Sequence, residues 1–550
     1  YWAEVTYDLL GRAVLATAPD GSTLSTVYDG LNVSKTNAKD QIKTEHYNVL
    51  GQVIQVTDSD SFSMYYQHDS QGNLTSVSDQ PAFSRNNTSV MVYDALGRKT
   101  SMDDPAKGAW SYQYNAFGEL INQTDAAKRT TKFTYDLLGR KTQRVDPATG
   151  SESKDGQTTT WKYDTQPNGL GQLASVTLEA SYTYSQTPYY DDFGRAVKTV
   201  TAVPGAGVFT QSQTFDHLGR PWQQFDASSG KQQNEHRGLQ TYYNAYGYAE
   251  AVTDVRHKDK DGSPKTVYQR ILSMDARGKV IQSQQGSGVT SNKSYNDATG
   301  LLEQVNSYKI LTPNIQNLNY QWDTLGNLEH RSDQSGDKNL TEEFTYDNMN
   351  RLIKAARIGS NEQTVTYDKI GNIESKTGVG EYKYADGSPH RLATTTHNSV
   401  TTEYTYDANG NNISSTDGRE LTYSAFDKVV NITKGDNQVT FDYGPDRSRF
   451  KRVDTLKKDS TAEIKTTYYL GGVEIVDYVG GGKDGQREYI RRLGSAIETL
   501  TYPKRRDGDT SPTETTHYLL HDHLGSLDLI TDAKGNVVQH HSFDAWGKRR

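Results

Sequence analysis

Cysteine is absent from the 550 residues of this chain. Without thiols, the protein can form neither disulfide bonds nor the thiolate zinc sites of small Cys-rich domains. Long hydrophobic runs are missing as well, since no segment approaches the 18 consecutive apolar residues of a membrane-spanning helix. We therefore expect neither disulfide staples nor a helix that crosses a membrane.

Apolar side chains are scarce: they make up 33% of the chain even with 37 Tyr counted among them. Globular proteins usually contain about 45–50%, Gly included. Disorder would be one explanation, but the net charge is only −8, aromatics reach 10%, and only 14 residues are Pro. Because Thr, Val and Tyr recur in alternation while helix signals are nearly absent, the composition predicts an ordered β-wall with polar surface on both sides.

Charge of one sign is not concentrated anywhere, with 60 basic against 68 acidic residues. The densest basic cluster is Lys504, Arg505 and Arg506, which we interpret as a solvated loop. This pattern argues against a nucleic-acid-binding stripe. The chain begins at Tyr1 without Met or a signal peptide, so we expect it to be a piece of a longer protein.

A repeated phrase, aromatic-Asp-x-x-Gly-(Arg/Asn), runs through most of the chain. Successive aromatic positions lie roughly 20 to 30 residues apart, and a period of this size is typical of repeat arrays. Further copies begin at Phe215, Trp322, Tyr367 and Tyr406. The four clearest copies comprise Tyr7, Asp8, Gly11, Arg12, Tyr93, Asp94, Gly97, Arg98, Tyr135, Asp136, Gly139, Arg140, Tyr190, Asp191, Gly194 and Arg195.

Each repeat has the features of a β-hairpin. Before Asp136 the sequence alternates, so that Phe133 and Tyr135 share one face. The Asp136 carboxylate can accept backbone N–H groups two or three residues on, and Gly139 can supply the positive φ that closes the turn. Arg140 is long enough to lie over an aromatic ring and to reach a neighbouring carboxylate. Because the same residues recur at one spacing, we interpret them as turn and ladder, although aromatic platforms beside acids would also suit sugar contacts.

Variation along the array predicts its organisation. Ser151–Thr160 and His257–Lys265 are expected to be polar loops between strands, and Tyr384-Ala385-Asp386-Gly387 a degraded copy of the phrase. Residues 466–480 still follow a strand–glycine turn–strand pattern. We expect residues 1–465 to form the repeat array, and residues 466–550 to hold its end together with the opening of a closing domain.

The phrase resembles the YD repeat of Rhs proteins, the C components of insecticidal toxin complexes, wall-associated polymorphic toxins and animal teneurins. The resemblance covers roughly residues 5 to 450. A more specific block near the end, Asp522-His523-Leu524-Gly525-Ser526 followed by Phe543-Asp544-Ala545-Trp546-Gly547, is similar to the opening of the bacterial Rhs-associated core domain. The two patterns together favour a bacterial toxin over a teneurin.

This resemblance implies an all-β fold in which tandem hairpins form a long spiralling sheet around a hollow, cocoon-like shell. In the family, the shell encloses a C-terminal effector toxin. The family's core domain continues to a segment that ends in Asp-Pro, where aspartates cut the chain. This sequence stops at Arg550 before such a segment, so no protease residue is assigned here.

Other catalytic or metal-binding chemistry is weakly supported. His517, His521, His523, His540 and His541 gather near the end, but no Cys or Glu-x-x-His pattern accompanies them. Gly480-Gly481-Gly482 lacks the Lys-Ser/Thr of a phosphate-binding loop and is expected to be flexible. We predict no catalytic residue, no cofactor and no metal.

The leading hypothesis is a non-catalytic container that is secreted by a bacterium and sequesters its own C-terminal toxin. A secretion apparatus or a toxin-complex component is a possible further partner. The alternative is an extracellular adhesion or glycan-binding surface that uses exposed aromatics such as Trp110, Trp161 and Trp222. A hydrolase with carboxylates in a cavity ranks third, because no acid pair stands out from the repeated background.

Overall fold

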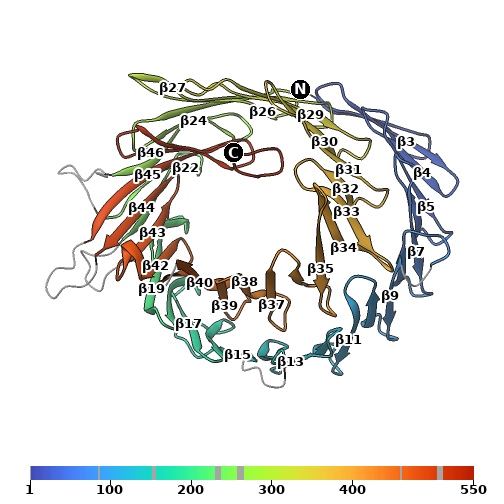
Figure 1. Cartoon of the computed structure of the whole chain (residues 1–550), viewed down its shortest axis with the longest axis horizontal. Helices are drawn as coiled ribbons and strands as arrows, with labels where there is room; N and C mark the ends of the chain where they lie inside the picture. Colours follow the sequence, from blue (N-terminus) through green and yellow to red (C-terminus); the bar gives the residue numbers. More distant parts are fainter. Residues whose placement is uncertain are drawn as a thin grey trace. The chain divides into compact units, whose positions relative to one another are not determined.

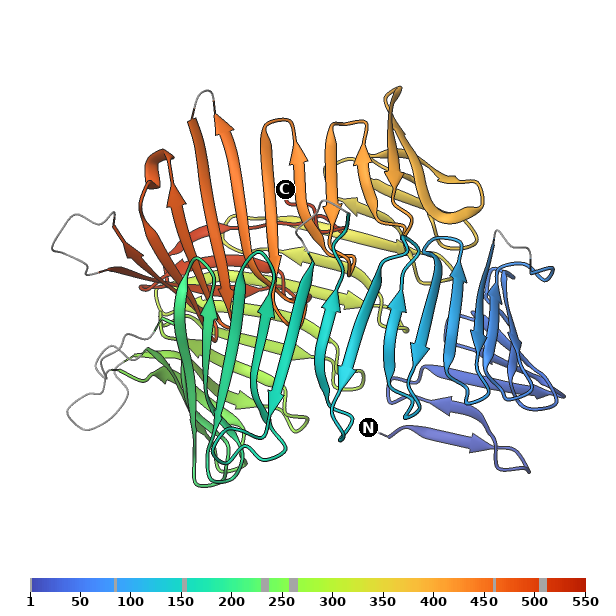
Figure 2. The same ribbon diagram turned by 90° about the horizontal axis from the view of Figure 1, so that it is seen from below.

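The computed structural model describes residues 2–83, 87–150, 156–228, 237–256, 266–458, 461–503 and 512–550. These residues hold 47 β-strands, which form one antiparallel sheet. In the registers we can follow, each strand pairs with the next one in sequence, as Thr134↔Gln143 illustrates for β13 and β14, and Figure 2 shows the alternating strand directions. The predicted all-β fold of tandem hairpins in one long sheet is confirmed.

The chain folds into two compact units, each assembled from three separate stretches. Unit 1 comprises Tyr1–Lys128, Lys293–Val305 and Asn317–Asp417, and unit 2 comprises Arg129–Asn292, Asn306–Gln316 and Gly418–Arg550. In each unit, strands far apart in sequence therefore come together (Figure 1).

Unit 1 begins with twelve strands and later receives nine more, while β25, β26 and β27 contribute residues to both units. The first twelve are β1 (Glu4–Tyr7), β2 (Ala13–Thr17), β3 (Thr23–Asp29), β4 (Asn32–Thr36), β5 (Ile42–Tyr47), β6 (Val53–Thr57), β7 (Ser63–His68), β8 (Leu74–Ser78), β9 (Thr88–Tyr93), β10 (Lys99–Asp104), β11 (Gly108–Tyr114) and β12 (Leu120–Thr124). The shared strands are β25 (Thr290–Tyr295), β26 (Leu302–Lys309) and β27 (Thr312–Trp322). The later nine are β28 (Leu328–Asp333), β29 (Leu340–Tyr346), β30 (Leu352–Arg357), β31 (Gln363–Tyr367), β32 (Ile373–Lys376), β33 (Gly380–Ala385), β34 (Ser388–His397), β35 (Val400–Tyr406) and β36 (Asn412–Ser415).

Unit 2 contains twelve strands from its first long stretch and eleven from its last. The first set is β13 (Thr130–Tyr135), β14 (Lys141–Asp146), β15 (Gln157–Tyr163), β16 (Leu173–Glu179), β17 (Thr183–Tyr190), β18 (Ala196–Val203), β19 (Gly207–Phe215), β20 (Pro221–Phe225), β21 (Gly238–Tyr243), β22 (Ala249–Asp254), β23 (Val267–Met274) and β24 (Val280–Gln285). The last set is β37 (Arg419–Tyr423), β38 (Val429–Lys434), β39 (Asn437–Tyr443), β40 (Arg449–Lys458), β41 (Thr461–Leu470), β42 (Val473–Val479), β43 (Arg487–Leu493), β44 (Ala496–Tyr502), β45 (Thr513–His521), β46 (Leu527–Asp532) and β47 (Val537–His540).

The apolar core lies mainly in unit 2. Its largest cluster joins Leu178 and Val203 of the earlier strands to Phe450, Leu470 and Ile475 of the later strands. Two smaller clusters, around Tyr268 with Leu493 and around Val289 with Leu529, repeat this arrangement. Burying these side chains between two passes of the sheet supplies the hydrophobic stabilisation that a single two-stranded hairpin lacks.

The first stretch of unit 1 is leaner. Among its described residues, from 2 to 128, every fully buried residue is polar, as with Ser78, Thr88 and Asp125, and the buried apolar side chains of unit 1 come from later strands, such as Tyr320 and Phe344. This lean wall accounts for the low apolar content of the sequence.

One local prediction needs correction. Gln157–Thr160 was expected to lie in a polar loop but forms the start of β15, because these residues pair with Gln143–Asp146 of β14. The predicted loop at Gly480–Gly482 leads into a 3₁₀ turn, Gly481–Lys483, in which Gly480 and Gly481 adopt positive φ, and its flexibility stays a prediction. The predicted loop at 257–265 and the basic cluster at 504–506 lie outside the described residues.

The boundary predicted at residue 465 falls within β41, and it stays a prediction. No helix in the described part of the chain has the length and apolar character needed to cross a membrane.

Candidate functional site: the repeat turns and the contacts they make

Each repeat turn is organised by its aspartate. Asp94 follows β9, and its Oδ1 accepts the backbone N–H of Leu96 at 2.9 Å and that of Arg98 at 3.0 Å. The backbone N–H of Gly97 donates to the carbonyl of Asp94, and Gly97 has a φ of 73°. A residue with a side chain is strained at this φ, so the turn favours glycine, although Ser61 and Asn350 hold the same position in other turns with φ of 60° and 58°. The acceptor pattern is two and four residues on, one residue longer than the sequence suggested.

The arginine of the phrase links its own turn to the next hairpin. Arg98 donates from Nε to Oδ2 of Asp94 at 2.7 Å, and its guanidinium carbon lies 5.0 Å from the ring centre of Tyr114 in the next repeat. The Tyr114 hydroxyl donates back to the carbonyl of Lys99 at 2.9 Å. Cation–π contact and hydrogen bond together connect neighbouring hairpins. The same stacking joins Arg12 to Tyr28, Arg140 to Tyr163, Arg195 to Phe215, Arg220 to Tyr243 and Arg351 to Tyr367.

All four predicted copies of the phrase have this geometry. The aromatic residue ends a strand, the aspartate accepts the turn N–H groups, the glycine has positive φ, and the arginine pairs with its own aspartate. Each set of four residues acts within its own hairpin, together with the next aromatic ring. The sequence predicted that the arginine head would reach a neighbouring carboxylate. Arg140 confirms this, because it donates to both carboxylate oxygens of Asp164 in the next repeat, at 3.0 and 2.7 Å, as well as to Asp136 of its own turn.

The ion pairs favour the charged form of the turn aspartates. The side-chain hydrogen bond from Arg98, with the backbone N–H of the same residue, lowers the pKa of Asp94. The pKa of Asp191 is lowered in the same way, by the side-chain hydrogen bond from Arg195 first. These carboxylates are tuned to hold a turn and carry their charge at neutral pH, which suits scaffolding and not proton transfer.

The terminal block around Asp522 forms another turn of the same kind. Oδ1 of Asp522 accepts the backbone N–H groups of Leu524 at 2.9 Å and Ser526 at 2.8 Å, and Gly525 has a φ of 80°. His523 is half-buried, and Leu524 is exposed. The turn joins β45 to β46, so these predicted core-domain residues extend the sheet of unit 2.

In unit 1, the turns of the later strands rest on the opposite turns of the earlier strands. Asn409 donates from Nδ2 to Oδ2 of Asp125 at 2.9 Å, and the Lys39 ammonium lies 2.6 Å from Oδ2 of Asp323. A Cβ on Gly410 would lie 2.3 Å from the carbonyl oxygen of Ala106, so this contact also requires glycine. Further pairs are Gln41 with Asn350, Asp60 with Asn348, Pro105 with Ser388 and Ala106 with Arg391.

Unit 2 contains a buried ionic cluster that the sequence did not reveal. Arg491 on β43 is fully buried and donates from Nε to Oδ2 of Asp226 at 2.9 Å, and from Nη1 to Glu498. Tyr268 donates to Oδ2 of Asp254 at 3.0 Å, and burial in this cluster raises the pKa of the Tyr268 hydroxyl. The cluster comprises Arg237, Arg256, Arg491, Asp226, Asp254, Glu498 and Glu514, three cations and four carboxylates.

This cluster joins β20–β23 to β43–β45. Breaking one member would leave buried charges without a partner, which costs far more than an exposed pair is worth. The sequence does contain a signal for this pair. Side chains alternate between the two faces of a strand, so Arg491 lies on the same face as Leu493, and Glu498 on the same face as Leu500. Arg491 and Glu498 are also register partners of β43 and β44. A charge on an otherwise apolar strand face is a usable signal for a buried pair.

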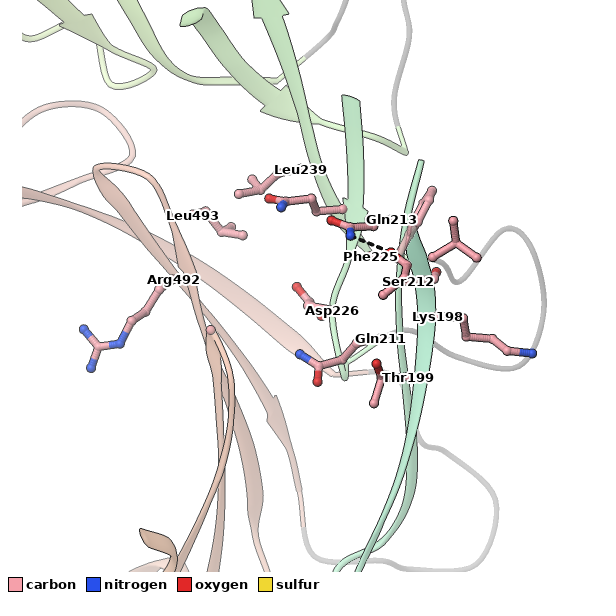
Figure 3. Close-up of a pocket in the computed structure, with 14 residues that line it drawn as sticks. Lys198, Thr199, Gln211, Ser212, Gln213, Phe225, Asp226, Leu239, Arg492 and Leu493 are labelled. Carbon is pink, nitrogen blue, oxygen red and sulfur yellow. Dashed lines mark hydrogen bonds between the residues drawn. The ribbon is translucent and has the colours of Figure 1, made fainter. Parts of the chain in front are cut away.

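A pocket of about 340 Å³ lies next to this cluster (Figure 3). Its lining is rich in polar groups, but many of them already form hydrogen bonds or ion pairs with other residues of the protein. Gln213 donates to the carbonyl of Ala196 at 2.7 Å, Asp226 accepts from Arg491, and Arg492 points away and donates to Glu474. The pocket is therefore a gap between packed strands, and its described lining residues do not form a catalytic arrangement.

In the described part of the chain, no group of three or more His, Asp or Glu side chains is placed to hold a metal ion. Trp110 donates to the carbonyl of Lys107, Trp161 lies near the Lys141 and Arg144 cations, and Trp222 is exposed. Glycan binding by these residues stays a prediction.

A single sheet of tandem hairpins, each closed by an aspartate–glycine turn and joined by arginine–aromatic contacts, defines a class of β-repeat protein. Residues 114–152 match the family described as RHS Repeat. No curated protein matches the chain in sequence.

Solved structures match over the whole chain. The crystal structure of TcdB2-TccC3 without its hypervariable C-terminal region aligns with a TM-score of 0.80 and 15% identity, covering 100% of this chain and 30% of that chain. The crystal structure of TcdB2-TccC3 gives 0.80 and 16%, covering 100% and 31%. The Photorhabdus luminescens Tc holotoxin pore with a TccC3 variant gives 0.80 and 15%, covering 100% and 30%.

The chain therefore contains an RHS repeat at residues 114–152 and has the fold of the TcdB2-TccC3 structures. It spans about a third of the length of the solved chains it matches.

Proposed function

We propose that this chain is the non-catalytic repeat shell of a secreted bacterial Rhs-type toxin, and that its sheet encloses a C-terminal effector polypeptide until delivery. The observation that carries the proposal is the match of the entire chain to the fold of TcdB2-TccC3, together with the RHS repeat at residues 114–152.

The physical character of the sheet supports this role. A container needs a thin wall with polar groups on both faces, since one face meets solvent and the other meets its contents. The first strands of unit 1 have this character: β3, for example, has exposed and half-buried residues only. Hydrogen-bonded strands and turn-to-turn contacts hold such a wall without a deep apolar core.

The chemistry of the turns supports a scaffold in place of an enzyme. Their aspartates and arginines are paired with one another, and the same set recurs in every clear copy. The effector at the C-terminal side is the partner that we propose for the interior, and a toxin-complex component is the external partner. Secretion follows from this proposal, because such a toxin acts on another cell.

The experiment asks whether chain placed after Arg550 is shielded. A sequence-specific protease site is inserted about 20 residues beyond Arg550 in the natural full-length polypeptide. A matched control carries the same site between Asn398 and Ser399, in the exposed turn of β34 and β35. We expect slow cleavage beyond Arg550 while the sheet is folded, fast cleavage in the control turn, and equal rates once urea unfolds both proteins.

Equal cleavage rates in the two folded proteins would remove the encapsulation proposal. Electron cryomicroscopy of the same polypeptide provides a second readout, because density for the C-terminal segment should then lie inside the sheet.

A further inference from the structure

Unit 1 contains a cavity of about 480 Å³ between its earlier strands and its later turns. Phe62, Met64 and Val77 line it from the earlier strands, and Met349 and Ile370 line it from the later turns. All five side chains stay partly accessible, whereas apolar side chains of unit 2 fill the space between two passes of the sheet. An apolar cavity of this size with a few polar groups in its wall is the usual form of a small-molecule site.

The turn at one wall of this cavity lacks the arginine of the repeat phrase. Oδ1 of Asp58 accepts the backbone N–H groups of Asp60 and Phe62, both at 2.9 Å, as the repeat aspartates do in their own turns. Phe62 stands four residues after Asp58, where Arg98 follows Asp94. Oδ2 of Asp94 accepts from Arg98, whereas Oδ2 of Asp58 receives no hydrogen bond from the described residues. The Asp58 turn thus has the anion of a repeat turn without its cation.

Acidic groups outnumber cations along the lining. Asp58, Asp79 and Asp104 contribute carboxylates from the earlier strands, and Arg351 and Lys369 contribute cations from the later turns. Arg351 already pairs with the aspartate of its own turn at 2.6 Å. Oδ1 of Asp79 is buried and receives no hydrogen bond in the described part of the chain. The lining therefore attracts a cation and repels an anion.

We infer that this cavity binds an amphipathic cation, with its apolar body against Met64, Met349 and Ile370 and its guanidinium or ammonium head on Oδ2 of Asp58. The head takes the place that the arginine holds in a repeat turn, and its N–H donors form charge-assisted hydrogen bonds with the carboxylate. The apolar body covers side chains that the fold leaves partly accessible. Binding at this cavity is independent of whether the sheet encloses an effector.

Two other kinds of ligand suit the cavity less well. An anionic amphiphile such as a fatty acid would bring a second negative charge against Asp58, and like charges at one site disfavour each other. A metal ion is not supported, because the described residues contain no group of three or more His, Asp or Glu side chains placed to hold one.

The test is a calorimetric titration of the natural full-length polypeptide with octylguanidinium. Octanoate keeps the apolar chain but has the opposite charge, and guanidinium chloride keeps the cation without the chain. We expect octylguanidinium to bind at least about tenfold more tightly than either control. Equal affinities for octylguanidinium and octanoate would overturn the inference, because apolar burial alone would then account for binding. An absence of binding would overturn it as well.

Matched variants locate the head group. Asp58→Asn keeps an acceptor oxygen for the turn, as Asn48 does in its own turn, and removes the charge. Asp69→Asn makes the same change in a turn whose aspartate already accepts from Asn73 and lies outside the lining. We expect the affinity for octylguanidinium to fall about tenfold in Asp58→Asn and to stay unchanged in Asp69→Asn. Equal affinities in the two variants would exclude Asp58 as the anchor and overturn the inference.

Photolabelling locates the apolar body and needs no substitution. An octylguanidinium analogue with a diazirine on its chain is irradiated together with the full-length polypeptide, and the labelled peptides are identified by mass spectrometry. We expect labels on peptides that contain Met64, Met349 or Ile370. Labels confined to other parts of the polypeptide would overturn the inference even where the titration detects binding.

Discussion

An aspartate at the start of a repeat turn accepts two backbone N–H groups and an arginine, and a glycine with positive φ closes the loop. Asn48 and Asn115 do the same work with an amide oxygen in place of a carboxylate. The turn therefore needs an acceptor at this position more than it needs a charge, while the arginine ladder needs the charge.

This distinction predicts the order of two variants at Asp94. Asp94→Ala removes the acceptor and the ion pair, and we expect a clear decrease in the unfolding midpoint. Asp94→Asn keeps the acceptor, so the decrease should be smaller. Urea unfolding followed by circular dichroism measures both midpoints. Equal midpoints for the two variants would show that the side-chain oxygen at position 94, which accepts the backbone N–H groups of the turn, contributes nothing to stability.

Gly11 and Gly410 hold the same position in their repeat turns, but only Gly410 packs closely against another turn. Replacing each by Ala therefore isolates the contribution of the turn-to-turn contact to stability. Gly11→Ala meets no atom within 4 Å and should cost only the left-handed backbone strain, about 1–2 kcal/mol. Gly410→Ala has the same strain and would also place its Cβ 2.3 Å from the Ala106 carbonyl oxygen. We expect a larger loss for Gly410→Ala, by about 1–3 kcal/mol. Equal unfolding free energies would show that the turn contact contributes nothing.

At the scale of elements, strands of unit 2 that are far apart in sequence are held together by apolar clusters and by buried ion pairs, which include the cluster around Arg491 and the contact of Arg447 with Asp146. Arg491 is fully buried between Asp226 and Glu498, whereas Arg492, the next residue, is exposed and paired with Glu474. Neighbouring residues of one strand thus lie in different environments, one buried and one exposed to solvent, because successive side chains point to opposite faces of the sheet.

This pair of arginines gives a matched prediction. Arg491→Met removes the fully buried cation between Asp226 and Glu498, although Glu498 keeps Arg237 and Arg256 at 3.5 Å, and should lower the free energy of unfolding by about 3 kcal/mol. Arg492→Met removes only an exposed ion pair, worth about 0–1 kcal/mol. Denaturant unfolding measures both. A near-neutral Arg491→Met would mean that the cluster is dispensable for the fold of unit 2.

The same cluster predicts a pH dependence. Burial alone would raise the pKa of Asp254, but hydrogen bonds from Arg256 outweigh it and lower that pKa. Arg237 and Arg256 likewise lower the pKa of Glu514 against its burial. Lowered folded-state pKa values mean that the stabilisation is complete above the unfolded value and is lost as the pH falls through the folded value.

We therefore expect flat stability from pH 7 to about pH 5 and a steep loss below about pH 4. Glu514→Gln should reduce the steepness, and a thermal-unfolding series across pH measures it. A loss of stability that begins near pH 6 would point to histidines instead of these carboxylates.

At the scale of the whole molecule, the sheet is continuous in sequence order, while the chain is organised into two compact units built from interleaved stretches. In repeat arrays, stability is local and spreads mainly to nearest neighbours. A destabilising substitution in one unit should thus speed amide hydrogen exchange mainly in the strands around it.

Amide hydrogen exchange of two variants, one in each unit, can test this expectation. We expect Gly410→Ala to speed amide exchange in strands of unit 1 around β10–β12 and β34–β36. Leu178→Ala, which should cost about 2–5 kcal/mol in the main core cluster, is expected to act on unit 2 around β16–β18 and β40–β42. Identical exchange maps for the two variants would show that the molecule unfolds as one cooperative body.

Much of this protein could be derived from the sequence because its main interactions are local. The alternation before Asp136, the turn at Gly139 and the arginine beside them all act within one or two hairpins, so their spacing along the chain is enough to predict them. Where a local pattern was ambiguous, as at Gln157–Thr160, pairing with a neighbouring strand decided the outcome.

The contacts that only the tertiary structure decided join residues about 200 to 310 positions apart, such as Gln41 with Asn350 and Tyr268 with Glu498. Local spacing carries no information on which distant turns meet, since every turn of the array has nearly the same sequence. The residue before the turn glycine illustrates this point: it is apolar and exposed at Leu96 but half-buried at Ile370, and only the packing of distant strands makes the difference.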